Sequence, residues 1–427
     1  MHDTQRRILL LQGPPTSFFR HLQAAFQARG IETLRVVFNA GDAIRAGKPV
    51  IHYRGRHSDW ADTLRKIITE HRITDVVYYA DRFPYHVTAT RIADEMGINP
   101  YVVENGYLRP FWLTLEPGGM GAYSRFPTDR KAIERIADGA PEVPAPTDYG
   151  HTFLTEAIFD VTTNMTQLAG YPAYPHYWRD RRHPLQEYFY WLPQLVRRNI
   201  GEFRAPRQLE RVLSDSTPFF LFPLQLQEDY QIRHNSHFNS LAEIIYDVFS
   251  SFSKHAPPGV TLLVKLHPLD NGLQDWRRVL KDFKRQHNLT GRIRLLGGGS
   301  LDTILDHAEG TVLVNSTVGL IALRRGRPVK TLGAAVFDLP GLTDPQPMDT
   351  FWSNPKPPDP DFVDVYVRAL TRATQLRGSF YEPTGVAVAC ETIVDRVLDG
   401  LAERDWFETP PPRLASALAA GIPEINL

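Results

Sequence analysis

Short apolar stretches alternate with helical stretches along this chain, and the alternation occurs twice. The first series covers residues 8–165, and the second begins after residue 210. Strands that alternate with helices of roughly ten residues or more are typical of βαβ units, whose strands lie parallel in one sheet. A chain of 427 residues exceeds one ordinary hydrophobic core and suits two domains of roughly 150–200 residues. We therefore expect two doubly wound, Rossmann-like α/β domains that face each other across a cleft.

The hydrophobic pattern places the individual elements and the domain boundaries. In the first series we expect strands at 8–11, 33–38, 75–79 and 100–103, and helices at 18–29, 62–71 and 85–96. In the second we expect strands at 219–222, 261–266, 292–296, 311–314 and 329–332, and helices at 238–253, 273–287, 301–307 and 318–325. The predicted parts are an N-terminal domain at 1–170, a connector at 171–210, a C-terminal domain at 211–380 and a helical tail at 381–427.

Aromatic and basic residues interleave in the predicted connector. They are Tyr171, Tyr174, Tyr177, Trp178, Tyr188, Phe189, Tyr190 and Trp191, with Arg179, Arg181, Arg182, Arg197 and Arg198. This composition suits a membrane interface or a phospholipid headgroup. It also suits a helical connector whose aromatic side chains pack and whose arginines are solvated, and we favour this second interpretation.

Composition excludes several classes of protein. The 48 basic and 48 acidic residues balance, so the chain lacks the positive charge that marks a nucleic-acid-binding protein. The single cysteine, Cys390, excludes an intramolecular disulfide and fits a reducing compartment. The apolar run at 8–11 is too short for the core of a signal peptide, and no stretch reaches the ~20 apolar residues of a membrane span. We expect a soluble, cytoplasmic protein that could touch the inner face of a membrane.

Three polar motifs follow successive strands of the second series. They are Gln225-Leu226-Gln227-Glu228-Asp229, Lys265-Leu266-His267-Pro268 and Asn315-Ser316-Thr317-Val318-Gly319. Because parallel strands end at one edge of their sheet, polar residues that follow them build a ligand site there. Asp229 offers a carboxylate and His267 a proton donor, and the hydroxyls of Ser316 and Thr317 offer a cradle for an anion. This combination indicates a transferase that uses a nucleotide-activated sugar.

Each motif also has an interpretation that needs no ligand. Pro268 stops the strand and presents the His267 imidazole at the sheet edge, where it could bind a phosphate oxygen or only form part of a turn. Ser316 and Thr317 precede a helix whose free N–H groups bind anions well, and ordinary capping of that helix is compatible with this role. Gly319 would allow a ligand to approach closely.

Two carboxylates, one in each half of the chain, could perform the chemistry. Asp229 lies with Gln225 beyond a strand that ends in proline, and it could act as a nucleophile or cap the following helix. Glu104 closes the last strong strand of the first half and would face the same cleft. Glycosyl transfer with retention of configuration uses two carboxylates about 5–5.5 Å apart, one as nucleophile and one as acid/base.

Other residues could contribute to binding. Arg54, Arg109 and Arg125 could bind an acidic sugar or a lipid phosphate, or they could be solvated surface residues. The glycine-rich turn at 297–300 is a further place where a nucleotide could lie, although it lacks the spacing of a dinucleotide fingerprint or a P-loop. The one Asp-x-Asp sequence, at 359–361, lies in a proline-rich loop, and no His/Cys cluster has zinc spacing. We therefore expect a site that needs neither a metal ion nor a cofactor.

Taken together, these motifs resemble the capsule polysaccharide synthesis family. The resemblance runs through Leu10-Leu11-Gln12-Gly13-Pro14-Pro15, Asn39-Ala40-Gly41-Asp42, Tyr53-Arg54-Gly55-Arg56, Glu104-Asn105-Gly106-Tyr107-Leu108-Arg109-Pro110, Pro223-Leu224-Gln225, Asp229-Tyr230-Gln231-Ile232, His267-Pro268, Asn315-Ser316-Thr317-Val318-Gly319-Leu320, Gly326-Arg327-Pro328-Val329-Lys330 and Pro340-Gly341-Leu342-Thr343. It spans nearly the whole chain in the right order. Within the family, the chain is similar to the smaller of the two transferases of 3-deoxy-manno-octulosonate (Kdo) that build the lipid-linked Kdo linker of transporter-exported capsules.

The resemblance implies a GT-B fold, CMP-Kdo as the donor and transfer with retention of the β configuration. It also implies an acceptor such as lyso-phosphatidylglycerol at the inner leaflet, and contact with an inner-membrane capsule assembly complex. His267 and residues 316–317 would hold the CMP phosphate, Asp229 would be the nucleophile and Glu104 the acid/base. Asn105 stands where the family commonly has an acid. Two alternatives therefore stay open: a non-catalytic capsule assembly or export factor, and a transferase for another CMP-linked acidic sugar such as sialic acid.

Overall fold

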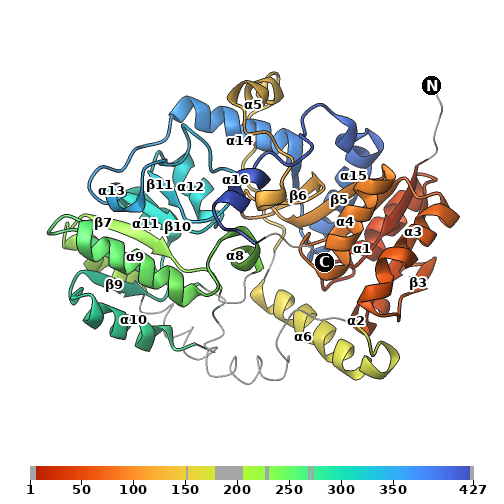
Figure 1. Ribbon diagram of the computed structural model, residues 1–427, viewed down its shortest axis with the longest axis horizontal. Helices are drawn as coiled ribbons and strands as arrows, with labels where there is room; N and C mark the ends of the chain where they lie inside the picture. The colour runs from red at the N-terminus through yellow and green to blue at the C-terminus, as the bar shows by residue number, and fades with distance from the viewer. Residues whose placement is uncertain are drawn as a thin grey trace. The chain divides into compact units, whose positions relative to one another are not determined.

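The structure is a computed structural model that describes residues 6–150, 152–177, 205–226, 230–267, 270 and 274–423 (Figure 1). The chain divides into two compact units. Unit 1 comprises Met1–Asp180, Tyr366–Leu414 and Ile425–Leu427, and unit 2 comprises Arg181–Val365 and Ala415–Glu424. Both units are α/β structures built on largely parallel sheets, which confirms the predicted fold class.

Unit 1 contains a seven-stranded sheet in the order β12-β6-β5-β4-β1-β2-β3. Its strands are β1 (Arg7–Leu10), β2 (Glu32–Val37), β3 (Val50–His52), β4 (Asp75–Tyr79), β5 (Asn99–Asn105), β6 (Trp112–Pro117) and β12 (Gln375–Arg377). The five strands from β1 to β5 are parallel, whereas β6 pairs antiparallel with both β5 and β12. The sequence pattern did not predict β3, β6 or β12.

Helices cover both faces of this sheet. The helices of unit 1 are α1 (Phe18–Ala28), α2 (Ala40–Ala43), α3 (Trp60–His71), α4 (Pro84–Met96), α5 (Arg130–Ala137), α6 (Phe153–Ala169), most of α14 (Pro360–Thr374) and α15 (Pro383–Leu398). On one face, α1 buries Phe18, Leu22 and Phe26 at helical spacing against the strands. On the other face, the Tyr78 hydroxyl lies 2.7 Å from the Thr90 hydroxyl of α4.

Residues near the end of the chain return to unit 1. Helix α15 packs beside α1 although the two lie near opposite ends of the sequence, as their blue and red colours show in Figure 1. It buries Ile393 and Val397 in the same core, and β12 extends the sheet by pairing with β6. This division differs from the predicted C-terminal domain at 211–380 and helical tail at 381–427, because apolar burial and strand pairing join 366–414 to unit 1.

Unit 2 contains a five-stranded parallel sheet in the order β11-β10-β7-β8-β9. Its strands are β7 (Phe219–Pro223), β8 (Thr261–Lys265), β9 (Ile293–Leu296), β10 (Gly310–Leu313) and β11 (Val329–Thr331). Its helices include α8 (Tyr230–Asn235), α9 (Leu241–His255), α10 (Trp276–Gln286), α11 (Leu301–His307), α12 (Val318–Arg324) and α13 (Met348–Phe351). The neighbours α9 and α10 pack over one face of the sheet (Figure 1).

Every strand and helix expected in the second series is present, with ends shifted by up to about three residues. Helix α9 begins at Leu241 rather than at 238, because the Ser240 hydroxyl accepts a hydrogen bond from the Glu243 N–H and caps the helix. Within the described part of the chain, no helix has both the length and the apolar character needed to cross a membrane.

Candidate functional site

Polar side chains meet at one edge of the unit 2 sheet, where β10, β7 and β8 lie side by side. Gln225, which follows β7, donates from Nε2 to Asn315 Oδ1 at 3.0 Å. In return, its Oε1 accepts the Asn315 backbone N–H at 3.4 Å. The structure therefore joins two residues that the sequence placed in one site, as expected for parallel neighbouring strands.

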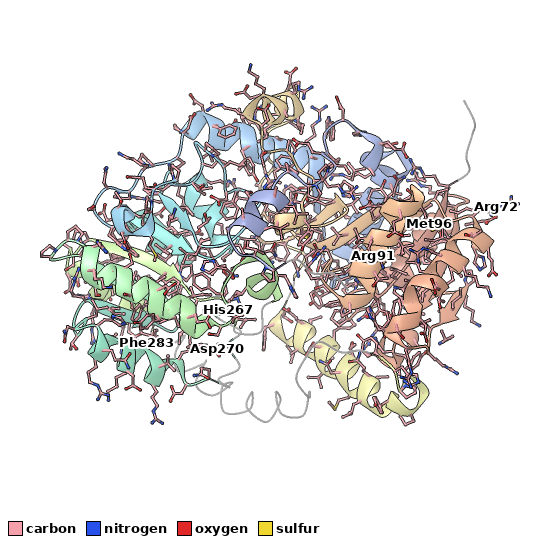
Figure 2. The ribbon with its side chains drawn as sticks, in the orientation of Figure 1. Arg72, Arg91, Met96, His267, Asp270 and Phe283 are labelled. Carbon is pink, nitrogen blue, oxygen red and sulfur yellow. The ribbon has the colours of Figure 1, made fainter. Side chains whose placement is uncertain are left out.

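His267 lies at the same edge, beyond the end of β8. Its carbonyl oxygen accepts the Asp270 N–H at 3.1 Å, and Figure 2 shows these two residues beside each other. Lys265, the last residue of β8, is almost fully buried, and this burial lowers the pKa of its ammonium group. Two further predicted site residues, Asp229 and Pro268, lie outside the described residues.

The motif at 315–319 forms a tight entry into α12. Ser316 Oγ accepts the Val318 N–H at 3.3 Å, whereas Thr317, the first residue before the helix, makes no capping hydrogen bond through its side chain. The structure also gives Gly319 a packing role. A Cβ at this position would lie only 2.6 Å from Cζ of the buried Phe337, so the absence of a side chain lets α12 approach that ring.

A pocket of about 600 Å³ opens beside the turn that follows β9. Its lining includes Leu209 and Leu213 from the helical stretch at 205–214, together with Gly299, Ser300 and Thr303. The hydroxyl of Ser300 is engaged, since it accepts the Thr303 N–H at 3.2 Å and caps α11. Because β9 is the neighbour of β8, this pocket lies at the same sheet edge as His267.

In unit 1, Glu104 is the last residue but one of β5 and is nearly buried. Its Oε1 accepts both the backbone N–H of Asn105 at 2.8 Å and the side-chain amide of Asn105 at 3.2 Å. The chain then reverses at Gly106, where a Cβ would lie 2.5 Å from the Trp112 carbonyl oxygen. Only glycine fits this turn, so the turn fixes the position of Glu104.

Gln375 supports this turn from a distant part of the sequence. It is buried in β12, and its Oε1 accepts the N–H groups of Tyr107 at 2.8 Å and Leu108 at 3.3 Å. Its Nε2 donates to Thr114 Oγ1 at 2.9 Å, directly opposite Glu104 on β6. Sequence reasoning missed Gln375, because a short edge strand carries no recognisable motif.

Further carboxylates lie near Glu104. The phenol of Tyr381 lies within reach of the negative charges of Glu156 and Asp160 of α6 and of Glu104. Burial, followed by the charges of these carboxylates, raises the pKa of Tyr381, so its hydroxyl keeps its proton. Tyr381 also forms a side-chain hydrogen bond with Glu156, so these four residues form one cluster. Sequence reasoning missed this group, which combines residues from three separate segments.

A buried ion pair follows β4, at the sheet edge where Glu104 also lies. Arg82 Nε is 3.1 Å from Asp81 Oδ2, and both side chains are almost fully buried. Asp81 Oδ2 also accepts the Met120 N–H at 2.8 Å, and the Arg82 guanidinium lies 3.8 Å from the centre of the Tyr123 ring. The pair holds the loop after β6 in place. A charged dipeptide one residue beyond the end of a buried strand was the signal that could have revealed it.

The three arginines expected to bind an acidic group do not come together. Arg54 follows β3 and lies over the ring of Tyr174, 5.5 Å from its centre. Arg109 is exposed in the loop between β5 and β6. Four strand spacings separate β3 from β5 in the sheet order, which is about 19 Å.

Arg125 lies at the opposite edge of the sheet from Glu104. It follows β6, which runs antiparallel to β5, and it lies against Gly118. Its guanidinium pairs with Asp94 near the end of α4 at 2.7 Å. The antiparallel direction of β6, which the sequence pattern did not predict, thus separates Arg125 from the other two arginines.

No group of three metal-binding side chains gathers among the residues that the structure describes. In the loop at 359–361, Asp359 Oδ1 accepts the N–H groups of Asp361 and Phe362 and so caps α14. The structure therefore gives this Asp-x-Asp sequence a structural role.

Comparison with known proteins identifies the class. Residues 74–381 match the family described as capsule polysaccharide biosynthesis protein, and the chain belongs to this family. It is 33% identical over 391 residues to the capsule polysaccharide modification protein LipB of Neisseria meningitidis serogroup A, covering 89% of this chain and 92% of that protein. It is 28% identical over 383 residues to the capsule polysaccharide export protein KpsS of Escherichia coli, covering 88% and 97%.

Among solved structures, the chain is similar to KpsC of Thermosulfurimonas dismutans, described as a β-Kdo 2,7 transferase. The TM-score is 0.47 at 14% identity, with coverage of 92% of this chain and 99% of that one. A likeness at this level assigns no activity to the chain.

Proposed function

We propose that this protein is a glycosyltransferase that transfers Kdo from CMP-Kdo to a lipid acceptor during capsule assembly, with retention of configuration and without a metal ion. The observation that supports this proposal is the edge of the unit 2 sheet, where the reciprocal Gln225–Asn315 pair joins the ends of the neighbouring strands β7 and β10. Strand β7 is also the neighbour of β8, which ends before His267. Amide and imidazole groups at the ends of parallel strands suit a phosphate and a nucleoside. Membership of the capsule family supports the cellular role.

The proposed chemistry has two displacements. In the first, a carboxylate oxygen of Asp229 bonds to the anomeric carbon as the bond from that carbon to the CMP phosphate oxygen breaks, while His267 hydrogen-bonds the departing phosphate. In the second, Glu104 removes the proton of the acceptor hydroxyl, whose oxygen displaces Asp229. Two inversions give net retention.

The donor site can be tested by calorimetric titration with CMP. Asn315→Ala removes the partner of Gln225 and one polar group of the site, so we expect CMP affinity to fall about tenfold, as expected for the loss of one or two hydrogen bonds. Asn239→Ala removes an exposed amide in the same unit and serves as the control. Unchanged affinity in Asn315→Ala would place the nucleotide elsewhere.

A second candidate function is a non-catalytic assembly or export factor. Asn105 favours it, because this amide binds the Glu104 carboxylate at a position where the family commonly has an acid. An Asp229→Ala, His267→Ala double variant that still supports formation of the capsule linker would establish this alternative. Competition between CMP-Kdo and CMP-sialic acid for the enzyme would identify the donor sugar.

A further inference from the structure

Helix α6 turns its polar side toward the body of unit 1. Asn164 is its one buried residue. Thr163 Oγ1 donates to the Pro15 carbonyl at 3.0 Å. The carboxylates of Glu156 and Asp160 lie on this inner side, near Tyr381. Phe159 also lies on this side, with its ring centre 6.1 Å from that of Tyr381, but no apolar residue of α6 is fully buried. An ordinary surface helix instead buries its apolar face.

The apolar side of α6 is exposed. Leu154 is 66% exposed, Ile158 54%, Val161 39% and Leu168 36%. Their spacing of four, three and seven residues places them on one face of the helix. The stripe extends to Tyr171, 60% exposed, just beyond the helix. Soluble proteins seldom expose a continuous apolar stripe of this kind unless it contacts something.

A basic segment adjoins this helix. Between residues 44 and 58 the chain carries Arg45, Lys48, Arg54 and Arg56 and no Asp or Glu. Arg45 contacts α6 directly, because its Nη1 and Nη2 donate to the hydroxyls of Thr163 and Thr162, each at 2.8 Å.

The far end of the basic segment contacts the residues that follow α6. His52 Nδ1 lies 2.5 Å from the Tyr174 hydroxyl, and Arg54 lies over the same ring. Ile44, at the start of the segment, is itself 61% exposed. An apolar stripe and a positively charged segment therefore lie next to each other on unit 1.

We propose that the stripe of α6 and the basic segment at 44–58 form the surface through which this protein docks onto an anionic phospholipid membrane. An apolar helical face enters the boundary between headgroups and acyl chains, while adjacent Lys and Arg residues attract anionic headgroups. A tyrosine at the end of the stripe suits the same boundary. The proposal concerns membrane attachment alone and does not depend on the proposed sugar transfer.

A second copy of the chain is the main alternative partner, since the stripe has the spacing of a coiled-coil seam. A two-fold pairing through α6 would bring the same basic segment of both copies to one interface. Like charges there are unfavourable, whereas an anionic membrane compensates them. The charge of the segment thus favours the membrane.

The test is sedimentation of the full-length protein with vesicles in the absence of any nucleotide sugar. We expect binding to phosphatidylcholine–phosphatidylglycerol vesicles and little binding to phosphatidylcholine alone. Ile158→Glu should weaken binding at least about tenfold, because it puts a charge in the stripe. Lys48→Glu combined with Arg56→Glu should weaken it similarly and reduce its dependence on salt.

Val388→Glu is the matched control. This residue is 39% exposed on α15 of the same unit, away from the stripe, and its substitution should leave binding unchanged. Circular dichroism melts of each variant establish that it is folded. Three results would overturn the proposal: no binding of the parent protein to anionic vesicles, Ile158→Glu binding like the parent, or a dimer in solution that Ile158→Glu dissociates without any vesicle binding.

Discussion

At the scale of single residues, buried titratable groups make the stability of unit 1 depend on pH. Glu116 on β6 is completely buried and accepts the Ser124 hydroxyl at 2.5 Å. Burial raises the pKa of Glu116 to about 7, against the lowering effect of hydrogen bonds from Ser124 and Tyr107. His86 is also fully buried, and burial lowers its pKa to about 4. As pH rises, the titration of Glu116 therefore lowers the free energy of unfolding, whereas the titration of His86 raises it.

Glu116→Gln should therefore change how stability depends on pH. A raised carboxyl pKa means that the folded protein keeps a proton that the unfolded chain loses, so stability from this group falls as pH rises from about 4.5 to about 7. The glutamine variant does not undergo this loss. Its free energy of unfolding, relative to that of the parent, should therefore rise by up to about 3 kcal/mol between about pH 4.5 and about pH 7.

Urea unfolding of both proteins near about pH 5 and about pH 8 measures the effect. The titration of His86 is common to parent and variant, so it cancels in the difference between them. A difference in unfolding free energy that stays constant with pH would show that Glu116 ionises normally in the folded protein.

At the scale of elements, the local pattern predicted most of the strands that are buried on both faces, but it missed β6, which is buried at every residue. The strand predicted at 75–79 is β4 with the same ends, because large apolar residues follow Asp75 without interruption up to Tyr79. The three missed strands are β3, β6 and β12. Both β3 and β12 are three-residue edge strands, and β12 pairs with β6 from more than 250 residues away. No local pattern encodes such a pairing.

Gly319 has a packing role in the structure and a predicted role in ligand approach, and its substitution separates the two. Gly319→Ala places a methyl group against Phe337 and Leu313, so we expect a loss of about 1–3 kcal/mol in unfolding free energy from overpacking. Gly297→Ala is the control, since a Cβ there would meet only Arg277, at 3.5 Å. Normal stability with weakened CMP affinity in Gly319→Ala would instead support the role in ligand approach expected from sequence.

At the scale of the whole molecule, the sequence predicted the parts of the site that depend on strand ends. Gln225 and Asn315 meet because parallel neighbouring strands bring their carboxyl ends together. The structure separates Arg125 from Arg54 and Arg109, because the direction of β6 depends on its tertiary pairing. Gln375 was missed for a related reason, since its partners lie far away along the chain. The catalytic roles of Asp229, Glu104 and His267 stay predictions.

The most direct test of the proposed activity measures CMP release from CMP-Kdo generated in situ, with lyso-phosphatidylglycerol as acceptor and no divalent metal. We expect CMP release coupled to a Kdo-lipid product, and an Asp229→Ala variant that still binds CMP but releases none. Absence of a Kdo-lipid product with the parent protein would contradict the proposed transfer. Undiminished turnover in Asp229→Ala would contradict the double displacement.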